Sequence, residues 1–148
     1  MKKALMLLTS VVFGAVLVGC QNEPTASTSK EQVVQAEMNH AVTGTVAYRE
    51  RIMLPDNAIV TVRLQDISLA DAPAKVLAEQ VMETKGAQVP FAFSLNYDGD
   101  EIQPGHTYSV SARIEVNGKL RFITDTIYPV ITDVEQTKNL NLMLVGVR

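Results

Sequence analysis

Residues 41–148 alternate between apolar and polar side chains with a period of two. The alternation is clearest in residues 59–67, 89–97, 107–116 and 139–144. Successive side chains of a β-strand point to opposite faces of its sheet, so each segment is expected to bury one face and expose the other. Weaker strand candidates are residues 42–49, 75–84 and 119–127.

Turn signals separate these candidate strands, among them Leu-Pro-Asp-Asn at 54–57 and Asp-Gly-Asp at 98–100. Short alternating strands at this spacing are typical of a β-sandwich. We therefore predict an all-β domain, a single antiparallel β-sandwich of about seven strands. The composition of residues 75–84 (KVLAEQVMET) also suits a helix, and that alternative stays open.

Three phenylalanines occupy the apolar phase of the candidate strands. They are Phe91, Phe93 and Phe122. Because one face of each strand is expected to be buried, we predict that these three rings share one core.

The hairpin around Asn117-Gly118 has two possible registers. A two-residue type I′ turn, which Asn-Gly usually forms, would place Ile114 opposite Arg121 and mix apolar with charged side chains on one face. A three-residue loop with Gly118 in a bulge places Ile114 opposite Leu120 and keeps the buried face apolar. We predict the three-residue loop.

The strand near the C-terminus has few charges of its own. Leu140, Leu142 and Leu144 alternate with Asn141 and Met143. Natural sheet edges are protected by charge, proline or a partner. Because residues 140–143 carry no charge, we predict that they form a sheet edge that is protected by a partner, namely a docked client segment. The alternative is that the tether or a neighbouring strand covers this edge.

The first nineteen residues have the features of an export signal. Met-Lys-Lys precedes an uncharged, mostly apolar run over residues 4–18, which is shorter than the ~20 residues that a membrane-spanning helix needs. Residues 17–20, Leu-Val-Gly-Cys, resemble the bacterial lipobox. We predict that residues 1–19 are a lipoprotein signal peptide.

Cys20 is the single cysteine of the chain, so it has no partner for an internal disulfide. A nucleophile, a metal ligand, an intermolecular disulfide and an attachment point are its possible roles. Its position directly after the apolar run favours attachment, with a lipid on the thiol and an acyl chain such as palmitate on the freed amine. We expect no cofactor besides this covalent lipid.

Residues 20–40 are polar and contain no aromatic residue, which is typical of a flexible tether. Residues 29–38 within it have the composition of a marginal helix. The folded domain is assigned to residues 41–148. Loss of residues 1–19 changes the formal charge from −3 to −5, and this acidic balance disfavours nucleic acid as a partner.

Three arginines form the candidate binding face: Arg63, Arg113 and Arg121. The three-residue hairpin loop places Arg113 opposite Arg121, and like charges opposed across strands are unfavourable. A bound phosphate or a partner's carboxylate would offset the repulsion. The alternative is a solvated face whose charge is balanced by neighbouring acidic residues such as Glu115 and Asp125.

No metal site or catalytic set is predicted. Residues 96–101 (NYDGDE) begin like a calcium loop, but Glu101 and Thr107 stand where Gly and Glu are needed. Met38 and His40 are too few for a copper site, and His106 is expected to serve a turn. Since no acid-base pair or nucleophile-base spacing is visible, the chain is predicted not to be an enzyme.

Three segments resemble the YbaY/YscW family of bacterial lipoproteins. They are residues 44–80, 90–98 and 108–132, in which LPDNA, ISLADAP and TDTIYPV are the most specific motifs. The resemblance implies a β-sandwich lipoprotein, and some members are pilotins, chaperones that bring a secretin to the outer membrane. Gln21 stands where inner-membrane lipoproteins carry Asp, which implies transport to the outer membrane with the domain facing the periplasm.

Two functions from different classes follow. The first is a non-catalytic chaperone or pilotin-like module that binds a secretin-like client during envelope assembly. The second is a general envelope lipoprotein that binds glycan or supports the cell surface without a secretin. Because the chain has four Phe, four Tyr and no Trp, with most on inward positions, the glycan function is the weaker hypothesis.

Overall fold

The computed structural model describes residues 40–132 and 137–148. The predicted signal peptide, Cys20 and the predicted tether up to residue 39 lie outside the described residues. His40 is already the first residue of a strand. No helix within the described ranges is long and apolar enough to cross a membrane.

Within these described residues, eight β-strands form one sheet, which confirms the all-β prediction. Residues 75–84, where a helix remained possible, are mostly strand. The expected strand over 119–127 ends at Ile123, and residues 124–127 form no strand. The elements are β1 (His40–Tyr48), β2 (Ile59–Asp66), β3 (Lys75–Glu83), β4 (Phe91–Tyr97), the 3-10 turn η1 (Gly99–Glu101), β5 (Tyr108–Val116), β6 (Lys119–Ile123), β7 (Tyr128–Val130) and β8 (Lys138–Gly146).

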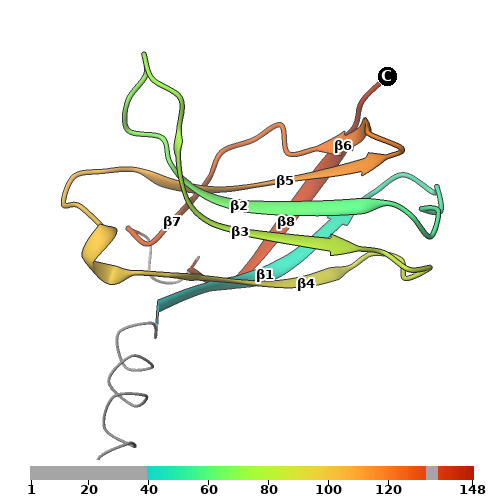
Figure 1. Cartoon of the computed structure of the whole chain (residues 1–148), viewed down its shortest axis with the longest axis horizontal. Helices are drawn as coiled ribbons and strands as arrows, with labels where there is room; N and C mark the ends of the chain where they lie inside the picture. Colours follow the sequence, from blue (N-terminus) through green and yellow to red (C-terminus); the bar gives the residue numbers. More distant parts are fainter. Residues whose placement is uncertain (1–39, 133–136) are drawn as a thin grey trace, which may run out of the picture.

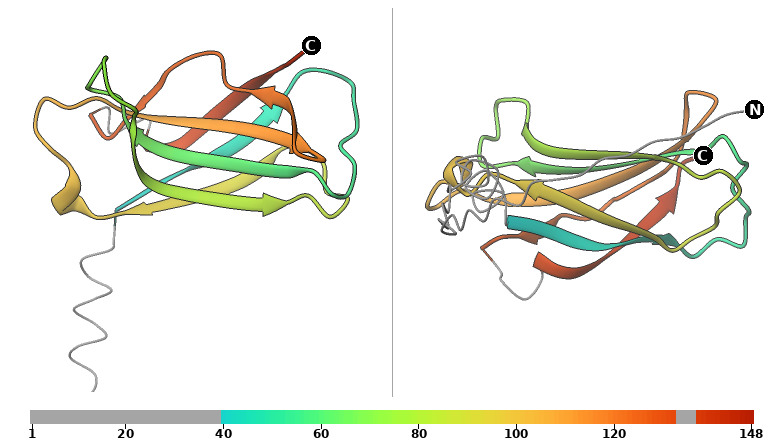
Figure 2. Two further views of the ribbon diagram at one scale, coloured as in Figure 1. Left: turned by 45° about the horizontal axis from the view of Figure 1, so that its top comes forward. Right: turned by 60° about the horizontal axis from the view of Figure 1, so that its bottom comes forward.

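The sheet is curled into a nearly closed, barrel-like shape rather than split into two flat layers (Figures 1 and 2). Its strand order is β3-β2-β5-β6-β8-β1-β4, with β7 beside β5. The terminal strands β3 and β4 meet at a seam, where the Ser94 backbone N–H donates to Gln80 Oε1 at 2.8 Å. β1 and β8 are parallel, whereas the sequence prediction was antiparallel throughout.

The inner face of the sheet holds the core. The alternating apolar residues of β2, β4, β5 and β8 are buried there, as the period-two pattern predicts. Phe93 and Phe122 are buried and Phe91 packs against the same cluster, so the prediction of one shared core is confirmed.

The predicted three-residue hairpin loop is wrong. Asn117 and Gly118 have φ values of 53° and 74°, and Val116 pairs with Lys119, as in a two-residue turn. A β-bulge between Ile114 and Glu115 then shifts the register, so that Ile114 meets Phe122. The bulge keeps the core face apolar without lengthening the turn.

The predicted edge at Leu140, Asn141, Leu142 and Met143 is also wrong, because β8 lies inside the strand order. It pairs with β1 along most of its length and with β6 at its last residues. The scarcity of charge in β8 reflects this interior position, since exposed edges are where strands carry protective charge.

Candidate functional site

A row of outward-facing side chains crosses five neighbouring strands. Strand pairing aligns Val81 of β3, Thr61 of β2, Arg113 of β5, Ile123 of β6 and Val145 of β8. We call these five residues the cross-strand row. Three of its members are apolar on the face where an alternating strand normally places polar side chains.

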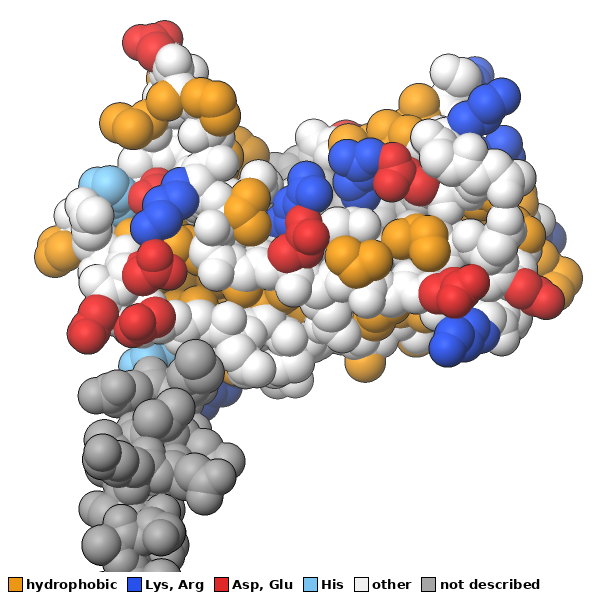
Figure 3. Space-filling model, in the orientation of Figure 1, with side chains coloured by type: hydrophobic (Ala, Val, Ile, Leu, Met, Phe, Trp, Pro, Cys, Tyr) orange, Lys and Arg blue, Asp and Glu red, His pale blue; other side chains and the backbone are white. Residues whose placement is uncertain are grey.

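The apolar members of the cross-strand row are open to solvent. Val81 is 57% exposed, and Ile123 and Val145 are each 37% exposed. Figure 3 shows hydrophobic side chains mixed with acidic and basic ones on this side of the molecule, over β2, β3 and β5. The mixture offers both apolar contact and charged hydrogen bonding to a bound segment.

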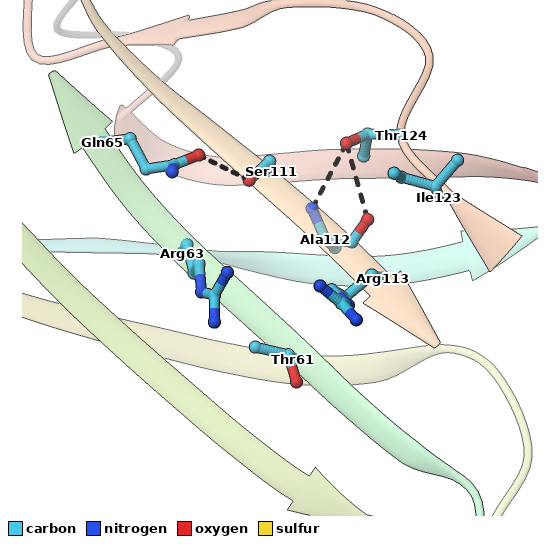
Figure 4. A pocket seen from close by; sticks show the side chains of 8 residues that line it. All are labelled: Thr61, Arg63, Gln65, Ser111, Ala112, Arg113, Ile123 and Thr124. Atoms are coloured by element: carbon cyan, nitrogen blue, oxygen red, sulfur yellow. Dashed lines mark hydrogen bonds between the residues drawn. The ribbon is translucent and has the colours of Figure 1, made fainter. Parts of the chain in front are cut away.

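A shallow groove lies over the centre of the row (Figure 4). We call it the arginine groove. It has a volume of about 210 Å³ and is lined by Thr61, Arg63, Gln65, Ser111, Ala112, Arg113, Ile123 and Thr124.

Hydrogen bonds fix the polar walls of the arginine groove. Ser111 Oγ donates to Gln65 Oε1 at 2.9 Å, and the Ala112 backbone N–H donates to Thr124 Oγ1 at 3.3 Å. Because these walls are already bonded, a ligand meets a surface that needs little ordering.

The two arginines of the groove are each held by a carboxylate. Arg63 pairs with Glu79 across the β2–β3 ladder, and Arg113 pairs with Glu115 two residues along β5. Both guanidinium groups rise from neighbouring strands on the same face (Figure 4). Their positive charges are therefore largely balanced, so specificity in the groove depends on hydrogen-bond geometry more than on net charge.

Arg113 retains one unused donor. Its Nε is buried and has no hydrogen-bond partner among the described residues. A buried donor without a partner is costly. Because Nε is buried, the Arg113 side chain must move before a bound segment can reach this N–H.

The structure brings together two of the three predicted binding arginines. Arg63 and Arg113 share the arginine groove, but Arg113 lies opposite Ile123 and not opposite Arg121. The predicted repulsion is therefore absent, because the two-residue turn and the β-bulge leave Arg121 as the extra residue of β6, without a cross-strand partner on β5. Arg121 lines a different cavity, described below.

Asp66 and His106 form a pair that sequence reasoning missed. Asp66 Oδ1 accepts from the N–H and Oγ of Ser68, and Asp66 Oδ2 lies 2.6 Å from His106 Nδ1. The hydrogen bonds from Ser68, followed by that from His106, lower the pKa of Asp66 to about 2. Since Ser68 Oγ also accepts from the Thr107 N–H, the cluster ties two loops together. His106 thus serves loop structure, as predicted.

The acidic stretch 96–101 is also structural. Asp98 Oδ1 accepts from the Asp100 backbone N–H at 2.8 Å and caps η1. Across the described ranges, no three His, Cys, Asp or Glu side chains are grouped so that they could hold a metal ion.

Comparison with known proteins shows which sequences and structures this chain is similar to. Residues 37–143 match the family model described as "Type III secretion system lipoprotein chaperone (YscW)". The Escherichia coli (strain K12) protein "Uncharacterized lipoprotein YbaY" is 44% identical over 121 residues, a match that covers 81% of this chain. The chain spans 64% of that relative's length, somewhat less than two thirds.

A solved structure extends the relationship. "Structure of an alternative pilotin from the type II secretion system of Vibrio cholerae" is 66% identical, with a TM-score of 0.70, and the match covers 73% of this chain and 96% of that chain. The family model spans most of the described sheet, and these relatives agree with the resemblance noted in the sequence. The chain belongs to the YbaY/YscW family of lipoproteins, whose model is that of type III secretion system lipoprotein chaperones.

Proposed function

We propose that this protein is a lipid-anchored, non-catalytic chaperone of the pilotin type, which binds a secretin-like client during envelope assembly. The observation that carries the proposal is the 66% identity to an alternative pilotin over 96% of that chain. Because about two thirds of the aligned residues are identical, we infer a shared mode of client binding.

The arginine groove and the cross-strand row suit a client segment with mixed chemistry. Val81, Ile123 and Val145 offer apolar contact, and the part-exposed guanidinium groups of Arg63 and Arg113 offer hydrogen-bond donors. We infer that the client presents apolar side chains with an acidic side chain or a backbone carbonyl between them. Such a segment is prone to aggregate when free, which gives a chaperone a reason to cover it.

The proposal includes an anchor at Cys20. A lipid on this residue would keep the domain at a membrane, and Gln21 at the next position favours the outer membrane. Cys20→Ala should accumulate as an uncleaved precursor without a lipid label. Normal lipid labelling of this variant would contradict the anchor without affecting the groove.

The glycan-binding alternative finds no support in the side chains. Within the described residues every aromatic side chain is buried or half-buried. Glycan surfaces usually stack sugar rings on exposed aromatic side chains, and this surface has none to offer.

The function is tested by secretin assembly in cells. A strain lacking this protein should have fewer secretin multimers in its outer-membrane fraction, and the wild-type gene should restore them. Arg113→Met and Ile123→Glu should restore them poorly, whereas Thr126→Glu, an exposed position outside the arginine groove, should restore them fully. Equal secretin assembly with and without the protein would overturn the proposal.

A further inference from the structure

A second cavity lies at the end of the sheet where β1 ends and where the C-terminus lies (Figure 1). Its volume is about 370 Å³. We call it the end pocket. Its floor is Phe122, its walls are Ile52, Val145 and Val147, and its rim carries Arg121 and Arg148.

The floor of the end pocket is rigid. Phe122 is 3% exposed and stacks on Tyr48, with ring centroids 4.2 Å apart and ring planes 12° apart. Tyr48 Oη donates to the Ile52 backbone carbonyl at 2.6 Å, which fixes the loop above the ring. A pocket held in this way needs little ordering when it binds.

The walls are fixed by two hydrogen bonds from backbone N–H groups. The Gly146 N–H donates to Glu50 Oε1 at 3.0 Å, and the Val147 N–H donates to the Arg121 carbonyl at 2.8 Å. These contacts join three separate segments of the chain around one cavity.

The walls are apolar and open to solvent. Ile52 is 51% exposed and Val147 is 44% exposed. Val145 belongs to both the end pocket and the cross-strand row, where it pairs with Ile123. The end pocket therefore continues the apolar part of the row and is not an isolated feature.

The rim carries two guanidinium groups. In the described part of the chain, Arg121 and Arg148 belong to no ion pair. Glu50, whose Oε1 accepts from the Gly146 N–H, and the α-carboxylate of Arg148 offset the two positive charges. The rim therefore complements an acidic group through the hydrogen-bond donors of its two guanidinium groups and not through a net positive charge.

We propose that the end pocket receives an apolar side chain of the client that is flanked by acidic residues. This inference rests on the proposed function and assigns it a second contact. The apolar walls and the buried Phe122 bind the side chain, and Arg121 and Arg148 bind the acidic neighbours. One client segment then lies across the arginine groove and ends in the end pocket.

The shape of the cavity favours a protein partner over a membrane surface. A concave pocket accepts a protruding side chain, whereas a bilayer presents a broad interface. In addition, residues 1–39 join the sheet at His40, which lies at the opposite end. The nine residues of β1 alone separate the two ends by roughly 30 Å.

Binding of a purified secretin to the full-length, lipidated protein in nanodiscs tests the inference. The probe is the secretin of the Vibrio cholerae type II secretion system, the system of the 66% identical pilotin. Ile52→Asp and the double variant Arg121→Glu/Arg148→Glu should each weaken binding at least tenfold. The double variant should also lose most of the salt dependence of binding, because its two guanidinium groups are gone.

Two control variants match these changes at the other end of the sheet. Leu69→Asp alters an exposed apolar side chain, and Lys138→Glu alters an exposed cation on β8. Both should bind within twofold of the wild type. All altered positions are exposed, and equal melting temperatures will verify that each variant folds.

A fluorophore identifies the occupant directly. With Cys20 lipidated, Val147→Cys supplies one free thiol for a polarity-sensitive dye. The dye emission should shift when secretin is added and stay constant when phosphatidylglycerol replaces the neutral lipid of the nanodisc. A shift with phosphatidylglycerol alone would assign the pocket to the membrane and overturn the inference.

The remaining outcomes separate the two proposals. Wild-type binding that the end-pocket variants leave unchanged would overturn the inference about the pocket and leave the proposed function standing. Absence of any binding by the wild-type protein would overturn both.

Discussion

At the end of the sheet that contains His40, charged side chains bind one another. Asp66 is bonded by Ser68 and His106, and Lys75 Nζ lies 2.9 Å from Glu101 Oε1. We call this the His40 end. Its charges hold together the loops between strands, so few remain for a partner.

The opposite end, here called the pocket end, differs because its arginines form no ion pairs in the described part of the chain. Arg51, Arg121 and Arg148 are among them, and they stand near exposed Ile52 and Met53. Apart from the Glu50 carboxylate, which accepts from the Gly146 N–H, its loops are held by uncharged groups. Gln88 Nε2 and Oε1 bind the backbone of Leu54, and Thr84 Oγ1 donates to Pro55 O.

This difference between the two ends indicates where a partner is expected to bind. Where loops are fixed by ion pairs, charge is part of the fold. Where loops are fixed by amides and hydroxyls, the arginines are left over and are available for binding. Substitutions of charge should therefore affect stability at the His40 end and affinity at the pocket end.

The largest effect is expected from the floor of the end pocket. Phe122→Ala should lower the free energy of unfolding by about 3–5 kcal/mol, because it removes a buried ring and leaves a cavity. Urea denaturation measures the change. Ile123→Ala, on the next and exposed position, should cost far less, and equal losses for both would show that the faces of β6 are inverted.

Gln88 tests whether uncharged groups hold the pocket end. Gln88→Ala should cost about 1–3 kcal/mol, because the half-buried N–H and carbonyl of Leu54 lose their partner. Thermal and urea unfolding measure the loss. Gln103→Ala removes an exposed amide at the His40 end and is expected to leave stability unchanged. A similar loss in both variants would break the comparison.

The dependence of stability on acid pH tests the role of Asp66 at the His40 end. The folded pKa of Asp66 is about 2, below its ordinary value of 3.8, so the unfolded chain binds the proton first as pH falls. The contribution of Asp66 to stability is therefore complete above pH ~4 and is lost as pH falls toward 2. Asp66→Asn should be less stable at pH 7 and should show a flatter acid dependence in urea unfolding.

A graded variant sharpens this result. Ser68→Ala removes one hydroxyl donor to Asp66 and should produce a smaller loss in the same direction. An acid profile of Asp66→Asn identical to that of the wild type would contradict the assigned role of the carboxylate.

The smallest effect is expected from a free arginine. Arg121→Ala should change the free energy of unfolding by less than about 0.5 kcal/mol, since its charge has no partner within the described residues. Lys75→Ala, which breaks the pair with Glu101, should destabilise the protein slightly more, and added salt should reduce the difference. If Arg121→Ala lowered the free energy of unfolding more than Lys75→Ala does, charge would matter more for stability at the pocket end than at the His40 end, which would contradict the comparison.

Period-two alternation was sufficient to predict the strands and their buried faces. Val60, Val62 and Leu64 are inward as expected, because the alternation follows directly from strand geometry. Strand order was not predictable in this way. The alternating leucines of β8 predict that one face of the strand is buried. They do not indicate which strands pair with β8.

The candidate site was predicted only in part for a similar reason. Arg63 and Arg113 lie on strands that pair directly, so their shared face follows from alternation. The cross-strand position of Arg121 depends on a single β-bulge. The position of that bulge is set by the need to bring Phe122 into the core. The Asp66–His106 pair joins residues forty positions apart and has no local sequence signal.

The parallel pairing of β1 with β8 has a consequence for how the protein is made. Thr45 Oγ1 donates to Asn141 Oδ1 across a separation of 96 residues. The pairing of β1 is therefore complete only after β8 has been synthesised and has folded against it. Contacts so distant in sequence slow folding, since a long loop must close first. Moreover, the walls of the end pocket run from Ile52 to Val147. A chain that has not yet been synthesised as far as Val147 therefore has no finished pocket.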